Sequence, residues 1–291
     1  MSEIACQCIG WDKPVVDLVA ERLLALANER PDAFRRAIVV VPTAESGRWL
    51  RERVAEMATE GAGRFKPVLM PEITLMGQLI PNGGKGVASE EDTLAAWLQV
   101  LGEQEESSLD EFAPLIPRRP QTHVERWRVG VAHKLITLRT KLEQCEVTVD
   151  SVTKELKKRQ DSAEANKAEK NAYWRENRRW AKLGALFAKV DALIKERGLQ
   201  PVEEYRAGYA ENPVWPGYHR LLVVACVPEV QPQLKRLLKN MHGRDKGEVL
   251  IWVNADEAQR GNFNAYGEPL ESEWADCSID IPNAFVYSDK E

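Results

Sequence analysis

The first turn whose residue types suggest a particular chemistry is Gly10-Trp11-Asp12-Lys13, near the N-terminus. A loop that binds the phosphates of ATP needs a long glycine-rich run followed by Lys and then Ser or Thr. Backbone N–H groups then surround the phosphates, and the hydroxyl holds magnesium. This turn has one glycine, and Lys13 is followed by Pro14, which has neither a hydroxyl nor an N–H. The sequence therefore predicts an ordinary connecting turn that does not bind ATP tightly.

A second place where ATP chemistry would need particular residues is the end of the apolar run Leu221–Val227. In nucleotide-hydrolysing proteins a magnesium-binding Asp and a catalytic Glu follow a buried strand of this kind. Here Ala225-Cys226-Val227-Pro228 takes that place, and Glu229 comes late. Because both halves of the chemistry are missing, we expect a chain that is not an enzyme and that needs no cofactor.

The remaining nucleophiles and metal ligands form no recognisable pattern. The four histidines, His123, His133, His219 and His242, are scattered, and no Ser-His-Asp or Cys-His grouping can be argued from spacing. The five cysteines include no CxxC pair and no histidine at zinc-site spacing, so we expect reduced thiols in a cytoplasmic protein. No basic region precedes an apolar core at the N-terminus, and no run approaches ~18 apolar residues, so neither export nor membrane insertion is predicted.

The charge of the chain is unevenly distributed, which is a sign of a polyanionic partner. Residues 118–200 contain 20 Lys/Arg against 11 Asp/Glu, whereas the rest contains 20 against 34. Within that region Lys154, Lys157, Lys158 and Arg159 form a basic cluster that could bind phosphates. The alternative is a solvated helix face, which is the commoner role of such a run.

Three further polar residues and three tryptophans are candidates for contact with nucleic acid. Thr43 and Thr74 could cap helices, contact DNA or do both. Arg48 could bind a phosphate or only solvate the first turns of its helix. The tryptophans could stack on bases, but their helical spacing favours packing between helices. They are Trp127, Trp174 and Trp180.

The element that would position Thr43 and Arg48 is the strand predicted over Ala37–Val41. Its five apolar residues, most of them β-branched, are typical of a strand buried on both faces. Pro42 ends it, and a helix with an apolar side follows. Strand, turn and helix in this order are half of a βαβ unit, and ligands of open α/β sheets bind at such turns, at the carboxyl ends of the strands.

The rest of the chain extends this pattern and interrupts it once. Further strands are predicted over Ile4–Ile9, Pro67–Met70, Leu221–Val227 and Val249–Val253, with Thr74 capping a short helix after the third. Helices are predicted from Pro14 to about Asn28, from a Ser89/Asp92 capping box, over Gln121–Cys145, over Tyr173–Arg197 and from Pro232. The passage Lys154–Lys170 is polar and charged.

These elements predict an α/β fold with a mostly parallel sheet of about five strands, helices on both faces and a large all-helical insertion. The predicted domains are residues 1–87 plus 212–291 for the α/β part and 88–211 for the insertion. Beyond Asn254 the chain is acidic and irregular, and we suspect that it continues in a longer protein.

Several short motifs stand in a fixed order along the chain. They are Ile38-Val39-Val40-Val41-Pro42-Thr43, Met70-Pro71-Glu72-Ile73-Thr74-Leu75, Arg179-Trp180-Ala181-Lys182-Leu183, Val227-Pro228-Glu229 and Tyr266-Gly267-Glu268-Pro269 ahead of Trp274. In this order they resemble the N-terminal region of AddB-type subunits of bacterial helicase–nucleases, which act in double-strand break repair and recombination.

The resemblance implies a P-loop-NTPase-like, superfamily 1 helicase fold that has lost its ATPase. It also implies that Thr43 and Thr74 fall in two segments that touch single-stranded DNA in active relatives. The family's ATP-binding residues are absent here. Its nuclease domain lies far downstream, and nothing in this chain matches it.

The function expected from these observations is a non-catalytic, inactivated helicase-like module. It would bind or guide single-stranded or forked DNA and dock a motor subunit of a helicase–nuclease. A scaffold that binds only proteins fits the acidic remainder of the chain equally well. A third hypothesis is a small-molecule enzyme that uses the carboxyl edge of the sheet. It ranks last of the three because the sequence contains no recognisable group of acid/base residues.

Overall fold

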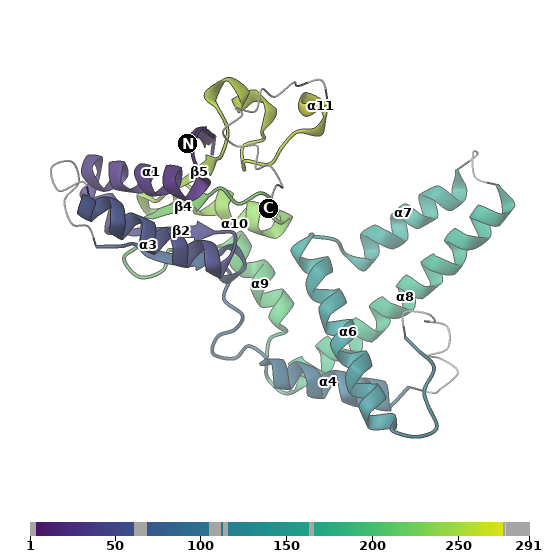
Figure 1. Ribbon diagram of the computed structural model, residues 1–291. Coiled ribbons are helices and arrows are strands. Elements are labelled where there is room, and N and C mark those ends of the chain that lie inside the picture. Colours follow the sequence, from purple (N-terminus) through teal and green to yellow (C-terminus); the bar gives the residue numbers. More distant parts are fainter. Residues whose placement is uncertain are drawn as a thin grey trace, which may run out of the picture. The chain divides into compact units, whose positions relative to one another are not determined.

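The computed structural model describes residues 4–60, 69–104, 112, 116–162, 166–275 and 277. The chain divides into two compact units (Figure 1). The sheet unit comprises Met1–Met76, Trp215–Val230 and Met241–Glu291, and the helical unit comprises Gly77–Val214 and Gln231–Asn240. The domain borders expected from the sequence, at 87/88 and 211/212, stay predictions.

The sheet unit is built on five parallel strands. They are β1 (Cys6–Cys8), β2 (Ala37–Val41), β3 (Glu72–Leu75), β4 (Leu221–Ala225) and β5 (Glu248–Val253), and their order across the sheet is β1-β5-β4-β2-β3. All four strand pairings are parallel, which confirms the predicted α/β fold with a parallel sheet. Every residue of β2 and β4 is buried, as their uninterrupted apolar runs require.

The connections of the two central strands run in opposite directions. After β2 the chain continues to β3 on one side, and after β4 it continues to β5 on the other. Because β2 and β4 are neighbours, their carboxyl ends form the topological switch point of the sheet, where ligands of open α/β sheets bind.

Helices α1 (Val15–Glu29), α2 (Pro31–Phe34) and α3 (Ala44–Glu60) cover one face of this sheet. Leu23 and Leu24 of α1 and Leu50 of α3 are buried in one core with Val39 and Trp252 of the strands. The alternate strand residues, which point to the opposite face, are buried as well. They are Ile38, Val40, Leu222, Val224, Val249, Ile251 and Val253.

The third strand lies later in the chain than the sequence predicted. Pro67 and Val68 are outside the described residues, and Leu69 and Met70 are not in a strand. Ile73 and Leu75 of β3 pack against the core and alternate with outward residues, the period expected of a strand. Thr74 therefore lies within β3, opposite Val40 in the sheet, rather than at the N-cap position of a helix as predicted, and η1 (Met76–Gln78) is a single 3₁₀ turn.

The helical unit contains α4 (Glu90–Gly102), α6 (Val124–Gln144), α7 (Val149–Asp161), α8 (Lys167–Glu196), α9 (Val202–Glu211) and most of α10 (Pro232–Met241). Its core lies between α4, α6 and α8, where Trp97 meets Phe187 edge to face at 5.7 Å between ring centroids. Ser89 and Asp92 form the predicted capping box of α4. Gly198, with φ 76°, follows the end of α8, as predicted.

Among the described residues of the helical unit, two helices, α7 and α9, lie where no element was predicted. Helix α7 begins at a capping box of Thr148 and Ser151, and α8 begins six residues before the predicted start, at a capping box of Asn166 and Glu169. Asn177 Nδ2 of α8 donates to the Thr153 carbonyl of α7 at 2.7 Å, so the two helices lie side by side. Helix α9 is the second unpredicted helix.

Within the part of the chain that the structure describes, the residues after β5 form only short elements. They are η3 (Glu257–Asn262) and α11 (Glu271–Trp274), while η2 (Arg244–Lys246) precedes β5. None of the described helices combines the length and the apolar character that crossing a membrane requires.

Candidate functional site

The turn after β1 has the geometry of a connection and not of a phosphate cradle. Gly10 adopts φ 94° and donates its N–H to the Ala255 carbonyl at 3.0 Å, while its own carbonyl accepts from Asn254 Nδ2 at 2.7 Å. Lys13 Nζ bonds Glu21 of α1 at 2.7 Å, and this hydrogen bond raises the pKa of Lys13. The lysine, which lies in the turn before α1, is therefore paired with a carboxylate of that helix.

The end of β4 offers no acidic group at the switch point. Cys226 follows the strand with φ 52° and donates its N–H to the Trp252 carbonyl at 3.0 Å. Burial raises the pKa of the Cys226 thiol to about 12, so the thiol is neutral at physiological pH. Glu229 is exposed, and the described residues include no group of three or more His, Cys, Asp or Glu that could hold a metal.

A cavity of about 290 Å³ lies at the carboxyl ends of β2 and β4. Its wall is apolar apart from Ser46 and the Cys226 thiol, and it includes Val15, Val41, Trp49 and Leu50. Trp49 is 50% exposed. Phosphate groups need N–H donors and cations, which this lining does not supply. The place that topology favours for a ligand is therefore lined for an apolar group.

Thr43 caps α3, which is one of the two roles expected of it. Its Oγ1 accepts from the Ser46 N–H at 3.0 Å and bonds the Ser46 hydroxyl at 2.8 Å. Thr43 remains exposed, so the cap leaves it accessible to a phosphate. Val41 of β2 pairs with Leu75 of β3, so Thr43 and Thr74 lie near neighbouring strand ends.

Arg48 lies on the surface of α3 between two carboxylates. Its guanidinium is 4.0 Å from Glu45 and 3.9 Å from Glu52, and all three side chains are mostly exposed. Exposed pairs of this length contribute little, so Arg48 can still meet a phosphate, but its neighbours reduce the local positive field. DNA contact by Thr43, Arg48 and Thr74 stays a prediction.

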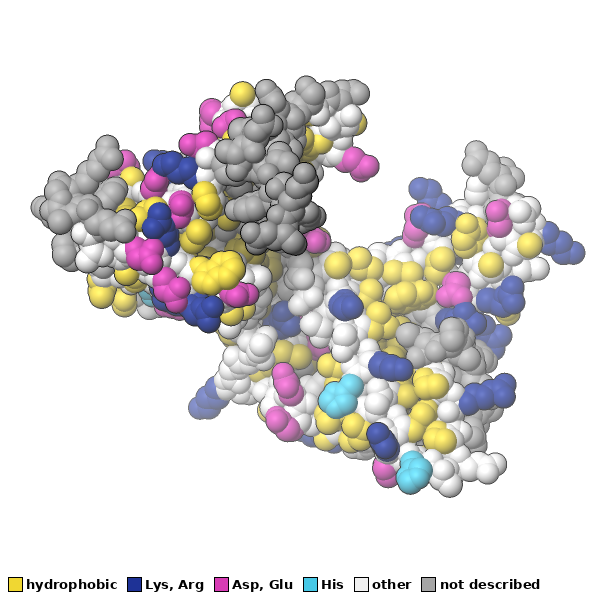
Figure 2. Space-filling view, in the orientation of Figure 1, with side chains coloured by type: hydrophobic (Ala, Val, Ile, Leu, Met, Phe, Trp, Pro, Cys, Tyr) yellow, Lys and Arg dark blue, Asp and Glu magenta, His cyan; other side chains and the backbone are white. Residues whose placement is uncertain are grey.

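The basic cluster lies on a two-helix arm of the helical unit. We define the arm as α7 together with residues 167–182 of α8. Neither part contains a buried side chain: α7 has none, and those of α8 begin at Leu183. Figure 2 shows Lys and Arg side chains gathered on α7 and α8. The arm therefore has charged side chains on its surface and no buried side chain of its own beneath them.

The four predicted cluster residues come together on α7, and all are exposed. Arg159 Nε bonds Glu155 at 2.9 Å, one turn earlier. Lys154, Lys157 and Lys158 have no ion pair with any described residue. Three ammonium groups that have no ion pair among the described residues lie within two turns of α7, and such groups can release counterions from a phosphate backbone, the physical basis of non-specific DNA binding.

The three candidate tryptophans have two different environments. Trp127 and Trp180 are partly buried against the core of α4, α6 and α8, and Trp127 Nε1 donates to the Pro117 carbonyl at 2.9 Å. Packing therefore accounts for both residues. Trp174 is on the arm, 51% exposed, with the guanidinium of Arg178 over its ring at 5.7 Å from the centroid.

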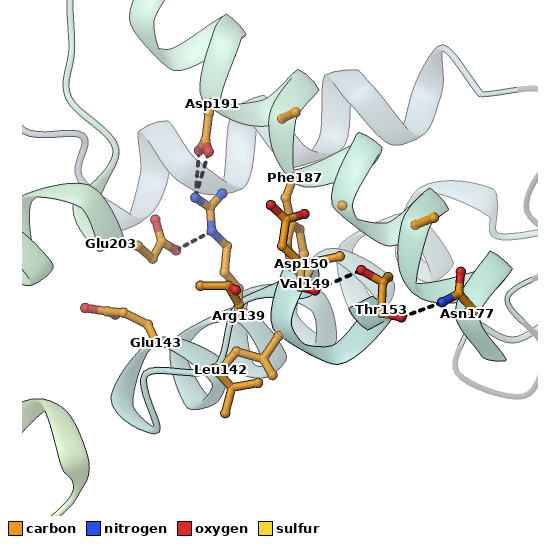
Figure 3. Close-up of a pocket in the computed structure, with 15 residues that line it drawn as sticks. Arg139, Leu142, Glu143, Val149, Asp150, Thr153, Asn177, Phe187, Asp191 and Glu203 are labelled. Carbon is orange, nitrogen blue, oxygen red and sulfur yellow. Dashed lines mark hydrogen bonds and ion pairs between the residues drawn. The ribbon is translucent and has the colours of Figure 1, made fainter. Parts of the chain in front are cut away.

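A buried charge cluster that the sequence did not predict lies between α6, α8 and α9 (Figure 3). Arg139 points to Asp191 at 2.8 Å and to Glu203 at 3.4 Å. Glu143 accepts from Gln233 and lies 3.6 Å from Arg206, and its burial raises the pKa of the carboxyl group.

This charge cluster borders a cavity of about 700 Å³, lined mainly by α6, α7 and α8. Its members stand on helices far apart in the sequence, and no spacing links them. Arg139 bonds carboxylates of both neighbouring helices, so the cluster ties α6 to α8 and α9. The arrangement holds the helices together, and it supplies neither a nucleophile nor an acid–base pair.

Glu268 is a further residue whose role only the structure reveals. Its carboxylate accepts from the Val230 N–H at 3.0 Å and from Asn264 Nδ2 at 2.7 Å, which fixes the loop after β4 to the segment after β5. Gly267, with φ 79°, lies so close to β5 that an added Cβ would be 2.8 Å from Val253. The motif Tyr266-Gly267-Glu268-Pro269 therefore has a structural role at the sheet.

Comparison with known proteins adds no family to this picture. Neither a scan against models of known protein families nor a search of curated proteins finds a match for this chain.

Proposed function

We propose that this chain is a non-catalytic, helicase-like module that binds or guides DNA in a bacterial repair helicase–nuclease and docks its motor subunit. The observation that carries the proposal is the arm, whose exposed Lys154, Lys157 and Lys158 have no ion pair with any described residue. Non-specific DNA binding arises from phosphate contacts of this kind and needs no reacting group.

The geometry at the sheet supports the inactive, P-loop-like part of the proposal. A parallel sheet with a turn and helix after its first strand is the framework on which a phosphate loop would stand. Here Lys13 is paired with Glu21, and the neutral Cys226 thiol follows β4. We therefore expect no magnesium-dependent ATP turnover, and no change in that result for Lys13→Ala.

The alternative function is a scaffold that binds only proteins. It is favoured by the apolar cavity at the switch point, with the exposed side chains of Val15 and Trp49 at its lining. Exposed apolar side chains around a cavity suit a protein side chain better than a phosphate.

DNA binding measured as a function of salt separates the two functions. The probe is a fluorescent forked oligonucleotide, and its anisotropy is followed from low to high salt. For the parent chain we expect affinity that falls steeply with salt. Replacing Lys154, Lys157, Lys158 and Arg159 by Glu should weaken binding at least tenfold and flatten the salt slope, independently of DNA sequence.

The matched control has the same change of charge away from the arm. It replaces Arg35, Lys85, Lys239 and Lys246, all exposed, by Glu. We expect the control to bind within a few-fold of the parent. If the parent shows no DNA affinity at low salt, or if both fourfold variants bind equally, the scaffold function replaces the one proposed.

A further inference from the structure

The arm contains an aromatic side chain that its own fold does not use. Trp174 is 51% exposed, whereas its neighbour Asn177 faces α7 and donates to the Thr153 carbonyl there. Large aromatic side chains on a helix surface normally bury most of their area, so an exposed indole on a basic arm suggests a partner.

A cation lies over the indole ring. The Cζ atom of Arg178, one helical turn later, is 5.7 Å from the ring centroid of Trp174. A guanidinium at this distance is attracted by the ring. The contact therefore favours orientations of the indole in which its ring faces Arg178.

Trp174 and Arg178 belong to one row along α8 that contains only cations besides the tryptophan. Lys170, Trp174, Arg178 and Lys182 follow each other at intervals of four residues, about 6 Å along the helix axis. The two carboxylates of this half of the helix are off the row and bonded elsewhere. Glu169 accepts from the Asn166 N–H at 2.8 Å, and Glu176 accepts from Arg179.

We infer that this row is a stacking platform for an unpaired base of single-stranded DNA, with Trp174 on the base and Lys170, Arg178 and Lys182 along the phosphates. The inference rests on the proposed function, because it names the form of DNA that the arm holds. Single-strand binding commonly combines an aromatic surface for bases with cations for the backbone. In a duplex the base faces are stacked on each other, so an indole on a helix surface has no access to them.

The test compares Trp174→Ala with Trp49→Ala, which removes an equally exposed indole from the sheet unit. The probes are a fluorescent poly-dT oligonucleotide, an abasic oligonucleotide of the same length and a blunt duplex. We expect Trp174→Ala to lower the affinity for poly-dT about tenfold, with the salt slope unchanged because no charge is lost. Affinity for the abasic strand and for the duplex should stay within twofold of the parent, and Trp49→Ala should match the parent on all three probes.

A second variant distinguishes the loss of the aromatic ring from a loss of structure. Trp174→Phe keeps an aromatic face and should restore most of the poly-dT affinity. If Trp174→Ala binds poly-dT like the parent, or loses the abasic strand equally, the platform is wrong while the DNA-binding function stands. If the parent binds none of the three probes at low salt, the proposed function itself fails.

Discussion

The carboxyl edge of the sheet and the arm of the helical unit each have a different part of what a ligand site needs. The edge has the topology of a ligand site, at the switch point between β2 and β4, but its cavity is lined by apolar side chains and a neutral thiol. The arm lies outside the sheet, yet it presents an exposed tryptophan and exposed lysines that have no ion pair with any described residue. Topology says where a ligand would bind, and only the side chains say whether binding chemistry is present.

The largest expected contrast is between the reactivities of two thiols. With a pKa of about 12, roughly one Cys226 side chain in ten thousand is ionised at pH 8. Cys145 is exposed. We expect alkylation of Cys226 by iodoacetamide to be on the order of a thousandfold slower than that of Cys145, because the thiolate is the nucleophile. Mass spectrometry of peptides from a time course measures both rates, and equal rates would mean that the edge is open and polar.

A carboxylate placed at the edge should destabilise the protein, whereas one on the arm should not. Cys226→Asp puts a charge into the apolar cavity and should lower the free energy of unfolding by about 2–3 kcal/mol at pH 7, less in acid. The left-handed backbone at this position suits Asp and offsets part of the loss. The control Lys157→Asp, on the exposed face of α7, should change stability by less than about 0.5 kcal/mol. Urea denaturation measures both, and an unchanged Cys226→Asp protein would contradict the apolar edge.

Substitutions of Thr43 distinguish the structural role of the turn after β2 from its predicted role in DNA binding. Thr43→Val removes the bond to the Ser46 N–H and should cost about 1 kcal/mol, whereas Thr43→Ser should retain the cap. Thermal denaturation tests the cap, and DNA anisotropy on the same proteins tests the contact. If Thr43→Val weakens DNA binding as strongly as the fourfold arm variant, the edge takes part in binding after all.

The smallest effect is expected at the buried charge cluster. Burial raises the pKa of Glu143 in the folded protein, so this group stabilises the fold below its ordinary pKa, and that contribution is lost as the pH rises through the raised value. Glu143→Gln keeps an acceptor for Gln233 and does not ionise. It should be slightly more stable than the parent at pH 7, and the difference should close in acid. A less stable variant at pH 7 would mean that the pair with Arg206 outweighs burial.

The strands of the sheet could be predicted from the sequence because they are buried on both faces. The runs at β2, β4 and β5 have no polar interruption, so each was predicted to within two residues. β3 was misplaced because only Ile73 and Leu75 of its four residues pack against the core, and the apolar run before it looked stronger.

The helices of the arm and the contacts of the charge cluster could not be predicted in the same way. Helix α7 contains no buried residue and has only three apolar residues, Val149, Val152 and Leu156, so charged residues dominate its sequence and no helix was predicted there. The charge cluster joins Arg139, Asp191 and Glu203 from three helices, and sequence spacing carries no signal for such contacts. The residues Lys154, Lys157, Lys158 and Arg159 were found because charge is visible without a fold.

The pairing of the strands has a consequence for how the chain acquires its structure. β1 pairs with β5, and β2 pairs with β4, so the sheet joins segments from opposite ends of the chain. Such non-local pairing carries a high loop-closure entropy and slows folding. The contacts of α7 with α8 and of α4 with α6 are local by comparison. During synthesis helices α4, α6, α7, α8 and α9 can therefore form before β4 and β5 have left the ribosome, and their folding shortens the loop that must close when β2 pairs with β4.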